Sequence, residues 1–199
     1  VKAVLLTGLA GQNSGGATVD VLYGKINPCG KLAETYPIKL SHVPASAYFP
    51  GDRYNVEYRE GLYVGYRYFE SVDAPVLFPF GYGLSYTSYA YRDLAVDKKE
   101  SSEDDTLKVT VTVDNTGERD GKEVVQLYVI HDGKTVYMPK VQLRAFDKVK
   151  IAAKSSATVT FILDKRAFAF YDVNEKDWVV ESGDYEIAVG GNVRELICR

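Results

Sequence analysis

The residues of this chain that could do hydrolytic chemistry are carboxylates in loop-like sequence. Hydrolysis of a glycosidic bond, for instance, needs two carboxyl groups across the scissile bond. Acidic residues in such segments are Glu34, Asp52, Glu57, Glu60 and Glu70. None of them has a local sequence that singles it out, and Glu60 beside Arg59 and near Arg67 is expected to form a salt bridge. The residues alone therefore show no complete active site.

A glycine-rich turn near the start of the chain is a second candidate. Residues 1–7 read as a buried strand and residues 17–22 as a helix, so the turn between them could place a phosphate at a helix N-terminus. The turn contains four glycines: Gly8, Gly11, Gly15 and Gly16. They lack the G-x-G-x-x-G spacing, and no Lys-Ser/Thr follows as in a P-loop. We expect them to permit a sharp turn between strand and helix.

Histidines and cysteines are few. His42 and His131 have no evident partners, and no G-x-S-x-G motif supports a serine nucleophile. Cys29 and Cys198 are predicted to lie in different domains, so neither a zinc site nor a disulfide framework is expected. We expect no metal and no cofactor.

Composition excludes some partners. Hydrophobic residues make up 46% and charged residues 26% of the 199 residues, which is ordinary for a globular protein with a core. The net charge of −3 disfavours nucleic acid as a partner. No apolar run approaches the roughly 20 residues that span a bilayer, so no membrane partner is expected. The localisation stays open between cytoplasmic and secreted.

The first part of the chain predicts a fragment of an α/β domain. Residues 1–7 (VKAVLLT) are almost continuously apolar, which is typical of a strand buried on both faces of a parallel sheet. With the helix at 17–22 and a possible strand at 31–36 they would form one β-α-β unit. Such a strand needs neighbouring strands and helices on both faces, and the chain supplies too few. The alternative is a small complete domain with an odd N-terminal strand.

Aromatic rings dominate the segment that follows. Ten of the sixteen tyrosines lie between Tyr48 and Tyr91, and repeated prolines and glycines prevent long regular elements there. Each ring carries about 150–250 Å² of surface, so we expect an ordered strap packed across a domain junction. The rings predicted to be buried are Tyr63, Tyr66, Tyr68, Phe69, Phe78, Phe80 and Tyr86.

From residue 107 onward the pattern is all-β. Leu107, Val109, Val111 and Val113 alternate with polar residues, which predicts a half-buried strand. Further strands are predicted at 122–130, 141–151, 157–163, 178–181, 185–190 and 193–198. About seven short strands without a helix favour an immunoglobulin-like or fibronectin type III-like sandwich. Its expected core comprises Val109, Val111, Val125, Leu127, Phe161, Ile187 and Val189, with the aromatics Phe168, Phe170 and Trp178.

Several blocks, in the right order, resemble family 3 glycoside hydrolases. The end of that family's α/β-sandwich domain is similar to GQNSGGATVDVLYGKINPCGKLAETYP (residues 11–37). The segment leading out of it is similar to EGLYVGYRYFE (60–70) and LFPFGYGLSYTSYAY (77–91). Its C-terminal fibronectin type III-like domain is similar to NTGERDGKEVVQLYV (115–129), LRAFDKV (143–149), DKRAFAFYD (164–172) and WVVESGDYEIAVG (178–190). Minor departures from the family pattern are Ala10, Asn13, Cys29 and Ala33, where the family usually has Pro, Glu, Ser and Pro.

The resemblance implies three parts. Residues 1–47 would be the C-terminal part of an incomplete α/β-sandwich domain, residues 48–91 a tyrosine-rich strap, and residues 92–199 a fibronectin type III-like domain. The expected fold is thus an α/β remnant followed by an all-β, immunoglobulin-like sandwich.

The resemblance also implies a role. Most members are retaining β-glycosidases, above all β-glucosidases, which remove terminal β-linked glucosyl residues from oligosaccharides. Their nucleophilic aspartate lies in an N-terminal (β/α)8 barrel, and their acid/base glutamate lies upstream of the segment matching Gly11. No residue of this chain therefore takes a catalytic role, Glu60 included. We expect the chain alone to be inactive and to complete an enzyme whose barrel and remaining sandwich part lie in the same protein or in a separate chain.

Two other classes are weaker. A free-standing carbohydrate-binding or structural module would show aromatics on a flat face, but the tyrosines here precede the β domain and sit among Pro and Gly turns. A nucleotide-binding βα protein is disfavoured by the glycine spacing. The glycone, the linkage, the oligomeric state and the origin of the chain (truncation, proteolysis or a split gene) stay open.

Overall fold

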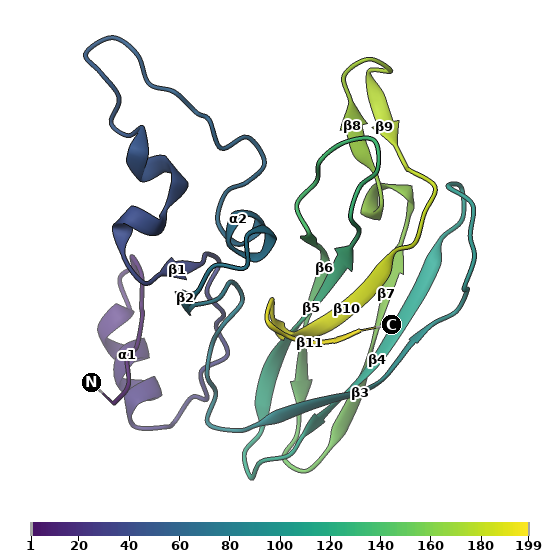
Figure 1. Cartoon of the computed structure of the whole chain (residues 1–199). Coiled ribbons are helices and arrows are strands. Elements are labelled where there is room, and N and C mark those ends of the chain that lie inside the picture. Colours follow the sequence, from purple (N-terminus) through teal and green to yellow (C-terminus); the bar gives the residue numbers. More distant parts are fainter. Residues whose placement is uncertain (1, 199) are drawn as a thin grey trace.

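Alternating apolar and polar residues build a β-sandwich from the second half of the chain. The computed structural model, which describes residues 2–198, shows two antiparallel sheets packed face to face (Figure 1). The cause is clearest in β4 (Leu107–Asn115), where Val109, Val111 and Val113 are fully buried and the residues between them are not. Successive side chains of a strand point to opposite faces, so this period of two turns one face into the core.

The larger sheet has four strands in the order β11-β10-β5-β6. Its strands are β11 (Glu195–Cys198), β10 (Glu186–Asn192), β5 (Gly121–Ile130) and β6 (Val141–Ile151). β5 is buried along most of its length because it lies inside the sheet and also supports the strap. β6 is an edge strand, paired only with β5.

The smaller sheet has three strands in the order β3-β4-β7. Its outer strands are β3 (Tyr89–Val96) and β7 (Ser156–Leu163). After β7 the short helix η3 (Lys165–Ala167) leads into a hairpin of β8 (Phe170–Asp172) and β9 (Asp177–Val179), which projects from one end of the sandwich (Figure 1).

One apolar core fills the space between the sheets. All seven predicted core residues belong to it, which confirms that part of the prediction. Burying one such side chain stabilises the fold by about 1.5–3 kcal/mol. Replacing the largest of them by alanine, Phe161→Ala, is expected to cost about 3–5 kcal/mol.

The three aromatics assigned to that core are placed differently. Phe168, Phe170 and Trp178 are only half-buried, and Phe168 alone packs against the core cluster. Phe170 and Trp178 lie in the β8–β9 hairpin, where Trp178 makes an edge contact with Tyr171. The hairpin leaves the sandwich, so its rings cannot reach the space between the sheets.

The tyrosine-rich strap crosses the face of the larger sheet. Its helix α2 (Tyr66–Ser71) begins after Gly65, whose φ of +58° suits glycine, and buries Tyr66 and Phe69 on one face. Four other rings predicted to be buried are half-buried: Tyr63, Tyr68, Phe78 and Phe80. The prediction for Tyr86 was wrong, because its side chain is 44% exposed; its hydroxyl donates to the carbonyl of Val21, and the guanidinium of Arg119 lies over its ring.

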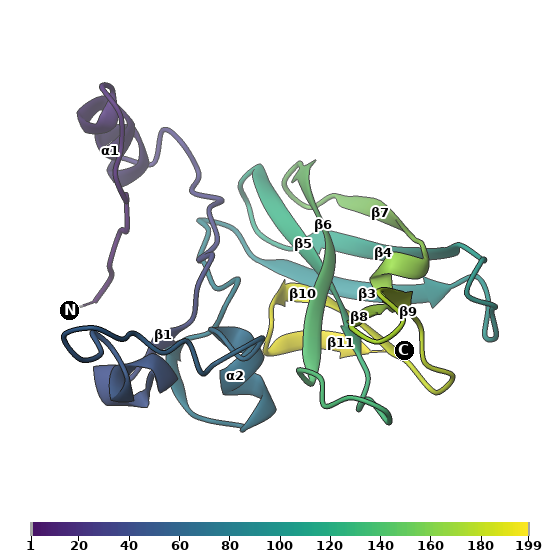
Figure 2. The ribbon, with the colours of Figure 1, turned by 90° about the horizontal axis from the view of Figure 1, so that it is seen from above.

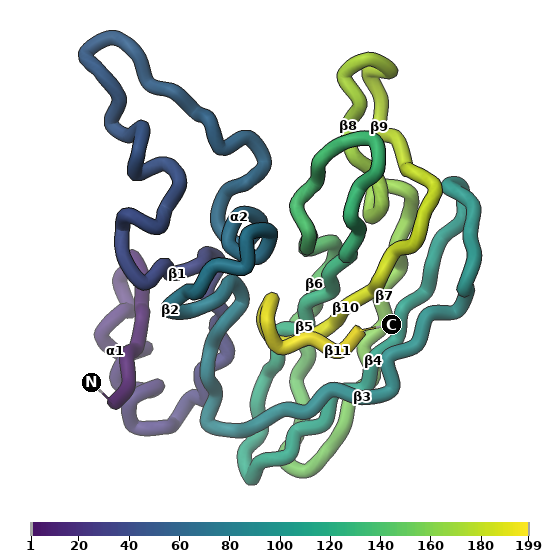
Figure 3. The backbone as a smooth tube through the Cα atoms, in the orientation of Figure 1, coloured from purple at the N-terminus to yellow at the C-terminus, as the bar shows by residue number. Residues whose placement is uncertain are grey.

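Short elements make up the N-terminal part. They are α1 (Ser14–Leu22), β1 (Tyr36–Pro37), η1 (Leu40–His42) and η2 (Pro44–Ala47). β1 pairs with β2 (Val76–Phe78) of the strap in a two-stranded sheet. Seen from above, α1 stands away from the sandwich on extended chain (Figure 2), and the tube shows the same separation of the two parts (Figure 3).

Two predicted strands of this part are not formed. Residues 2–7 have no strand structure and are exposed, with Val4 at 78%, and Val1 lies outside the described residues. Of residues 31–36 only Tyr36 is in a strand. A strand forms by pairing, and along residues 2–198 no strand lies beside 2–7. The helix predicted at 17–22 is present but buries none of its residues, contrary to the expected inner face.

Candidate functional site

The candidate carboxylates lie apart and have local partners. Asp52 accepts the backbone N–H groups of Tyr54 and Asn55, each at 2.7 Å, and these bonds lower the pKa of Asp52. Glu57 pairs with Arg59. The carboxylates of Asp52 and Glu57 thus bind groups within their own surface loop and do not face one another across a cleft.

The salt bridge predicted for Glu60 is not formed. Arg59 is taken by Glu57, and its guanidinium lies over the ring of Tyr48, 4.8 Å from the centroid. Arg67 lies over the ring of Tyr66 instead. Glu34, the remaining candidate, is exposed in the N-terminal part.

Glu70 braces the strap against the sandwich. Its carboxylate accepts Nε–H of Arg194 at 2.9 and 3.1 Å, and Arg194 also donates to the carbonyl of Ala74 at 2.7 Å. Burial raises the pKa of Glu70, and the ion pair with Arg194 opposes that shift. The bond joins α2 to the β10–β11 turn, so Glu70 serves the junction.

A cluster of aromatic rings forms the centre of this junction. The ring of Tyr66 lies 4.7 Å from that of Phe80 and meets Tyr128 edge-on at 6.2 Å. The hydroxyl of Tyr66 accepts the backbone N–H of Leu143 at 2.9 Å. Ring area and a satisfied hydroxyl together fix α2 on the larger sheet.

Gln126 holds the strap from below. Its amide donates to the carbonyl of Gly191 at 2.6 Å and accepts the hydroxyl of the buried Tyr128 at 2.6 Å. Gly81, with a φ of +81°, packs directly against this amide, and a Cβ there would overlap it. Only glycine combines that backbone angle with that closeness.

A buried ion pair ties the chain before the strap to β5. Nζ of Lys31 lies 3.0 Å from Oε1 of Glu123, whose side chain is only 5% exposed. The same oxygen accepts the hydroxyl of Tyr91 at 2.9 Å. Burial raises the pKa of the Tyr91 hydroxyl, and the charge of Glu123 raises it further.

Asn27 and Arg119 anchor the segment after α1. Asn27 donates to the carbonyl of Asp120 at 2.9 Å and accepts from Ser85 and from the N–H of Tyr86, both at 2.8 Å. Arg119 donates to the carbonyl of Gly24 at 3.2 Å. The anchored chain therefore begins near residue 24, and one further bond, from the hydroxyl of Tyr86 to the carbonyl of Val21 at 2.9 Å, reaches the end of α1.

Apolar side chains before that anchor lie open to solvent. We call this set the uncovered N-terminal surface: Val4, Leu5, Leu6, Leu9, Val19, Leu22 and Tyr23. Leu22, for example, is the last residue of α1, and its side chain is 63% exposed. Large exposed apolar patches mark interaction surfaces, so exposed apolar side chains gathered in one segment make that segment a candidate.

The buried histidine has partners that the sequence did not reveal. His131 lies 3.3 Å from the carboxylate of Glu181 and 2.9 Å from the carbonyl of Asp184, and its ring stacks on Tyr185. Glu181 also accepts the N–H groups of Lys134 and Thr135. The cluster closes two loops of the sandwich on each other. His42 lies in η1, in the other part of the chain.

Residues 2–198 bring together no group of three or more His, Cys, Asp or Glu that could hold a metal ion. Cys29 and Cys198 are both free thiols. In the same described range, no helix is long and apolar enough to cross a membrane.

Two protein-family models match the sequence of this chain. A model described as "Glycosyl hydrolase family 3 C-terminal domain" matches residues 1–86, and one described as "Fibronectin type III-like domain" matches residues 123–193. The chain belongs to glycoside hydrolase family 3. It corresponds to the C-terminal part of the family's enzymes, which confirms both the resemblance and the predicted fold class.

Similar proteins include two bacterial enzymes and one solved structure. "Thermostable beta-glucosidase B" of Acetivibrio thermocellus is 50% identical over all of this chain, which covers 26% of that enzyme. An "Exo-alpha-(1->6)-L-arabinopyranosidase" of Bifidobacterium breve is 41% identical over 98% of this chain and 25% of its own length. The crystal structure of a Bifidobacterium adolescentis GH3 β-glucosidase superposes with a TM-score of 0.89 and 41% identity, over 94% of this chain and 28% of that one. This family 3 chain thus spans about a quarter of the length of its relatives.

Proposed function

We propose that this chain is the structural C-terminal quarter of a retaining β-glycosidase, specifically a β-glucosidase, and that it carries no catalytic carboxylate. Retaining hydrolysis needs two carboxyl groups about 5–5.5 Å apart. Of the five candidates here, Asp52, Glu57 and Glu70 are engaged by Tyr54, Arg59 and Arg194 in loop closure or bracing. In this proposal the nucleophilic aspartate and the acid/base glutamate both lie in upstream polypeptide.

One observation carries the proposal. The uncovered N-terminal surface exposes apolar side chains on an otherwise well-anchored chain, while the relatives continue for about three further quarters of their length. We infer that upstream polypeptide covers this surface and supplies strand neighbours for residues 2–7. Covering these side chains would stabilise the assembled protein by about 25 cal/mol for each Å² of apolar surface that is buried.

The proposed parts follow from this role. Residues 1–47 complete the α/β-sandwich domain, residues 48–91 strap it to the neighbour, and residues 92–199 form the fibronectin type III-like cap. The junction contacts of Lys31, Glu70 and Gln126 support the view that the strap transmits the stability of the cap to the residues before it. A rigid cap holds the domain edge in place, which a catalytic site built upstream requires.

The substrate class is proposed from the names of the relatives. They include β-glucosidases and an exo-α-(1→6)-L-arabinopyranosidase, so sugars other than glucose occur in this group. We propose a terminal β-glucoside because β-glucosidases predominate among these relatives. Its recognition would lie in the upstream domains.

Hydrolysis of an aryl β-glucoside tests the proposal. The 199-residue chain is assayed alone and with the remaining three quarters of the A. thermocellus relative supplied as a separate polypeptide. We expect no turnover by either polypeptide alone and turnover by the pair. Turnover by the purified chain, abolished by Glu60→Gln or Glu34→Gln, would contradict it.

A carbohydrate-binding module is the second candidate. Its support is the exposure of Phe49, Tyr54 and Tyr58 on the loop before α2, since sugars stack on aromatic rings. A glycan array probed with the chain decides between the two: binding that is lost in Tyr54→Ala/Tyr58→Ala would favour the module.

A further inference from the structure

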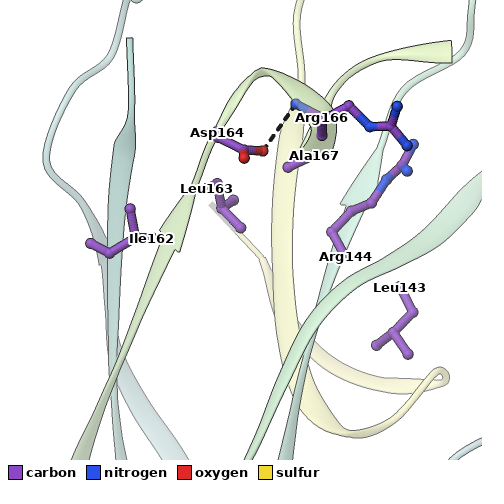
Figure 4. A pocket seen from close by; sticks show the side chains of 7 residues that line it. All are labelled: Leu143, Arg144, Ile162, Leu163, Asp164, Arg166 and Ala167. Carbon is purple, nitrogen blue, oxygen red and sulfur yellow. Dashed lines mark hydrogen bonds between the residues drawn. The ribbon is translucent and has the colours of Figure 1, made fainter. Parts of the chain in front are cut away.

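A hollow opens between the two edge strands β6 and β7, beside η3. It has a volume of about 390 Å³ and lies at the side of the sandwich that is formed by the edge strands β6 and β7. Its lining residues are Leu143, Arg144, Ile162, Leu163, Asp164, Arg166 and Ala167 (Figure 4). Two guanidinium groups and one carboxylate therefore line this hollow together with apolar side chains.

Arg144 is half-buried there and, within the described residues 2–198, has no counter-ion. Its Nη2 donates to the side chain of Gln142 at 2.8 Å and to the carbonyl of Ala169 at 3.4 Å, but its Nε–H is buried and has no hydrogen-bond partner. Burial lowers the pKa of this guanidinium, and the positive charges of Arg67 and Arg166 act in the same direction. A buried cation is stable only when something pairs with it.

Arg166 adds a second positive group. Its guanidinium lies over the ring of Trp178, 3.3 Å from the centroid, and Figure 4 shows its side chain reaching the same side of the hollow as that of Arg144. Along residues 2–198, neither arginine forms an ion pair with a carboxylate. Asp164 accepts the backbone N–H of Arg166 at 3.0 Å and so caps η3.

We propose that Arg144 and Arg166 form a binding site for a small oxyanion, the chemistry shared by carboxylate, sulfate and phosphate groups. A guanidinium presents parallel N–H donors that match two oxygens of such a group. The Arg144 guanidinium would gain the counter-ion it lacks, and Arg166 would close over the anion from its position on Trp178. The anion could be an acidic side chain of the upstream polypeptide or a free ion.

Trp178 is the single tryptophan of the chain and reports on this site. The chain is produced with 5-fluorotryptophan, and its fluorine NMR line is followed while acetate or sulfate replaces chloride at constant ionic strength. We expect a saturable shift. Arg144→Gln should weaken the apparent affinity about tenfold or more, because a charge-assisted bidentate pair is lost.

Two further variants keep the test sharp. Lys148→Gln removes a positive charge from an exposed position on the same strand and should leave the response unchanged. Arg166 is exposed, so Arg166→Gln should fold even if Arg144→Gln does not; it also removes the contact with Trp178, so its response is compared with its own anion-free spectrum and should be weaker. A shift that is linear with anion, or equal in the wild type, Arg144→Gln and Arg166→Gln, overturns the proposal.

The source of the anion is separated by adding the upstream polypeptide. If an acidic side chain fills the site, the fluorine line of the assembled pair is already shifted and acetate has no further effect. If a free ion fills it, acetate still saturates the site in the pair. Either result supports the site provided that the chain alone binds and Arg144→Gln does not.

Discussion

Glu123 is the residue on which the attachment of the N-terminal part depends most. Its buried carboxylate receives Lys31 from one part of the chain and Tyr91 from the start of the sandwich. A carboxylate taken out of water is tolerated only while such partners stay in place. Removing one partner is therefore more harmful than removing an exposed ion pair.

Lys31→Met tests whether removing a partner of the buried Glu123 costs more stability than removing an exposed ion pair. Loss of the ammonium leaves Glu123 buried without a counter-ion and with only the hydroxyl of Tyr91 as a partner, so the free energy of unfolding should fall by about 3–5 kcal/mol in urea titrations. The matched control is Lys25→Met, which breaks an ion pair in which Lys25 is 70% exposed and should cost no more than about 1 kcal/mol. Equal losses in the two variants would show that the Lys31–Glu123 pair is not the link described here.

Glu181 gives a pH-dependent prediction. Hydrogen bonds from Thr135 lower the pKa of Glu181 most, burial opposes them, and bonds from Lys134 and His131 help to bring it from its ordinary 4.5 to about 2. The folded state thus favours the carboxylate. Its contribution to stability is complete above about pH 4.5 and is lost as the pH falls toward 2.

Glu181→Gln should therefore be less stable than the wild type at pH 7, and the difference should shrink between pH 4.5 and 2. Thermal unfolding over that range measures it. Glu175→Gln, at an exposed position of the β8–β9 turn, should leave the pH dependence unchanged. A difference in stability between Glu181→Gln and the wild type that stays constant down to pH 2 would refute the assignment.

Among the elements, the strap is held to the sheet through close backbone packing as well as through rings. Gly81 and Gly61 both have positive φ, but only Gly81 lies against another side chain, the amide of Gln126. Alanine substitutions at these two positions therefore separate two losses of stability, one from the unfavourable backbone angle and one from displacing a neighbouring side chain.

Gly61→Ala should cost about 1–2 kcal/mol for the backbone angle alone. Gly81→Ala should cost a further 1–3 kcal/mol or so, because the displaced Gln126 leaves buried polar groups without partners. Urea unfolding of both variants gives the comparison. If both lose the same stability, the Gln126 contact does not hold the strap.

Strands that rest on local alternation could be predicted from the sequence, and those that rest on partners could not. β4 was predicted because its apolar residues recur with period two, and β5 because its sequence is more fully apolar. β3 was missed because a bulge at Asp93, with a φ of +54°, interrupts its pairing and its pattern. Residues 2–7 have the composition of a buried strand, but composition does not supply a neighbour.

The same limit applied to the candidate site. Glu70 and Arg194 are 124 residues apart, and His131 and Glu181 are 50 apart, so no local pattern could pair them. The buried rings Tyr66 and Phe69 could be predicted, because a strap rich in aromatics must bury some of them. The exposure of Tyr86 could not, since it depends on which face the sandwich covers.

At the scale of the whole molecule, the sandwich holds the main core, and the N-terminal part has little core of its own. A chain from residue 89 to residue 199 should therefore unfold in one cooperative transition, although it loses Lys31 and the strap. Circular dichroism and tryptophan fluorescence should give the same midpoint in urea. Two separate transitions would show that the sandwich is not one cooperative unit, and failure to fold would show that it depends on the strap.

Protection of backbone amides in the N-terminal part tests the central claim most directly. Hydrogen exchange is measured on the chain alone and after addition of the upstream three quarters of the A. thermocellus relative. We predict that amides of residues 2–26 exchange rapidly in the chain alone and become protected in the pair, while those of β4 and β5 are protected in both. Unchanged exchange of residues 2–26 in a pair shown to associate would contradict the claim that this surface is completed by upstream polypeptide.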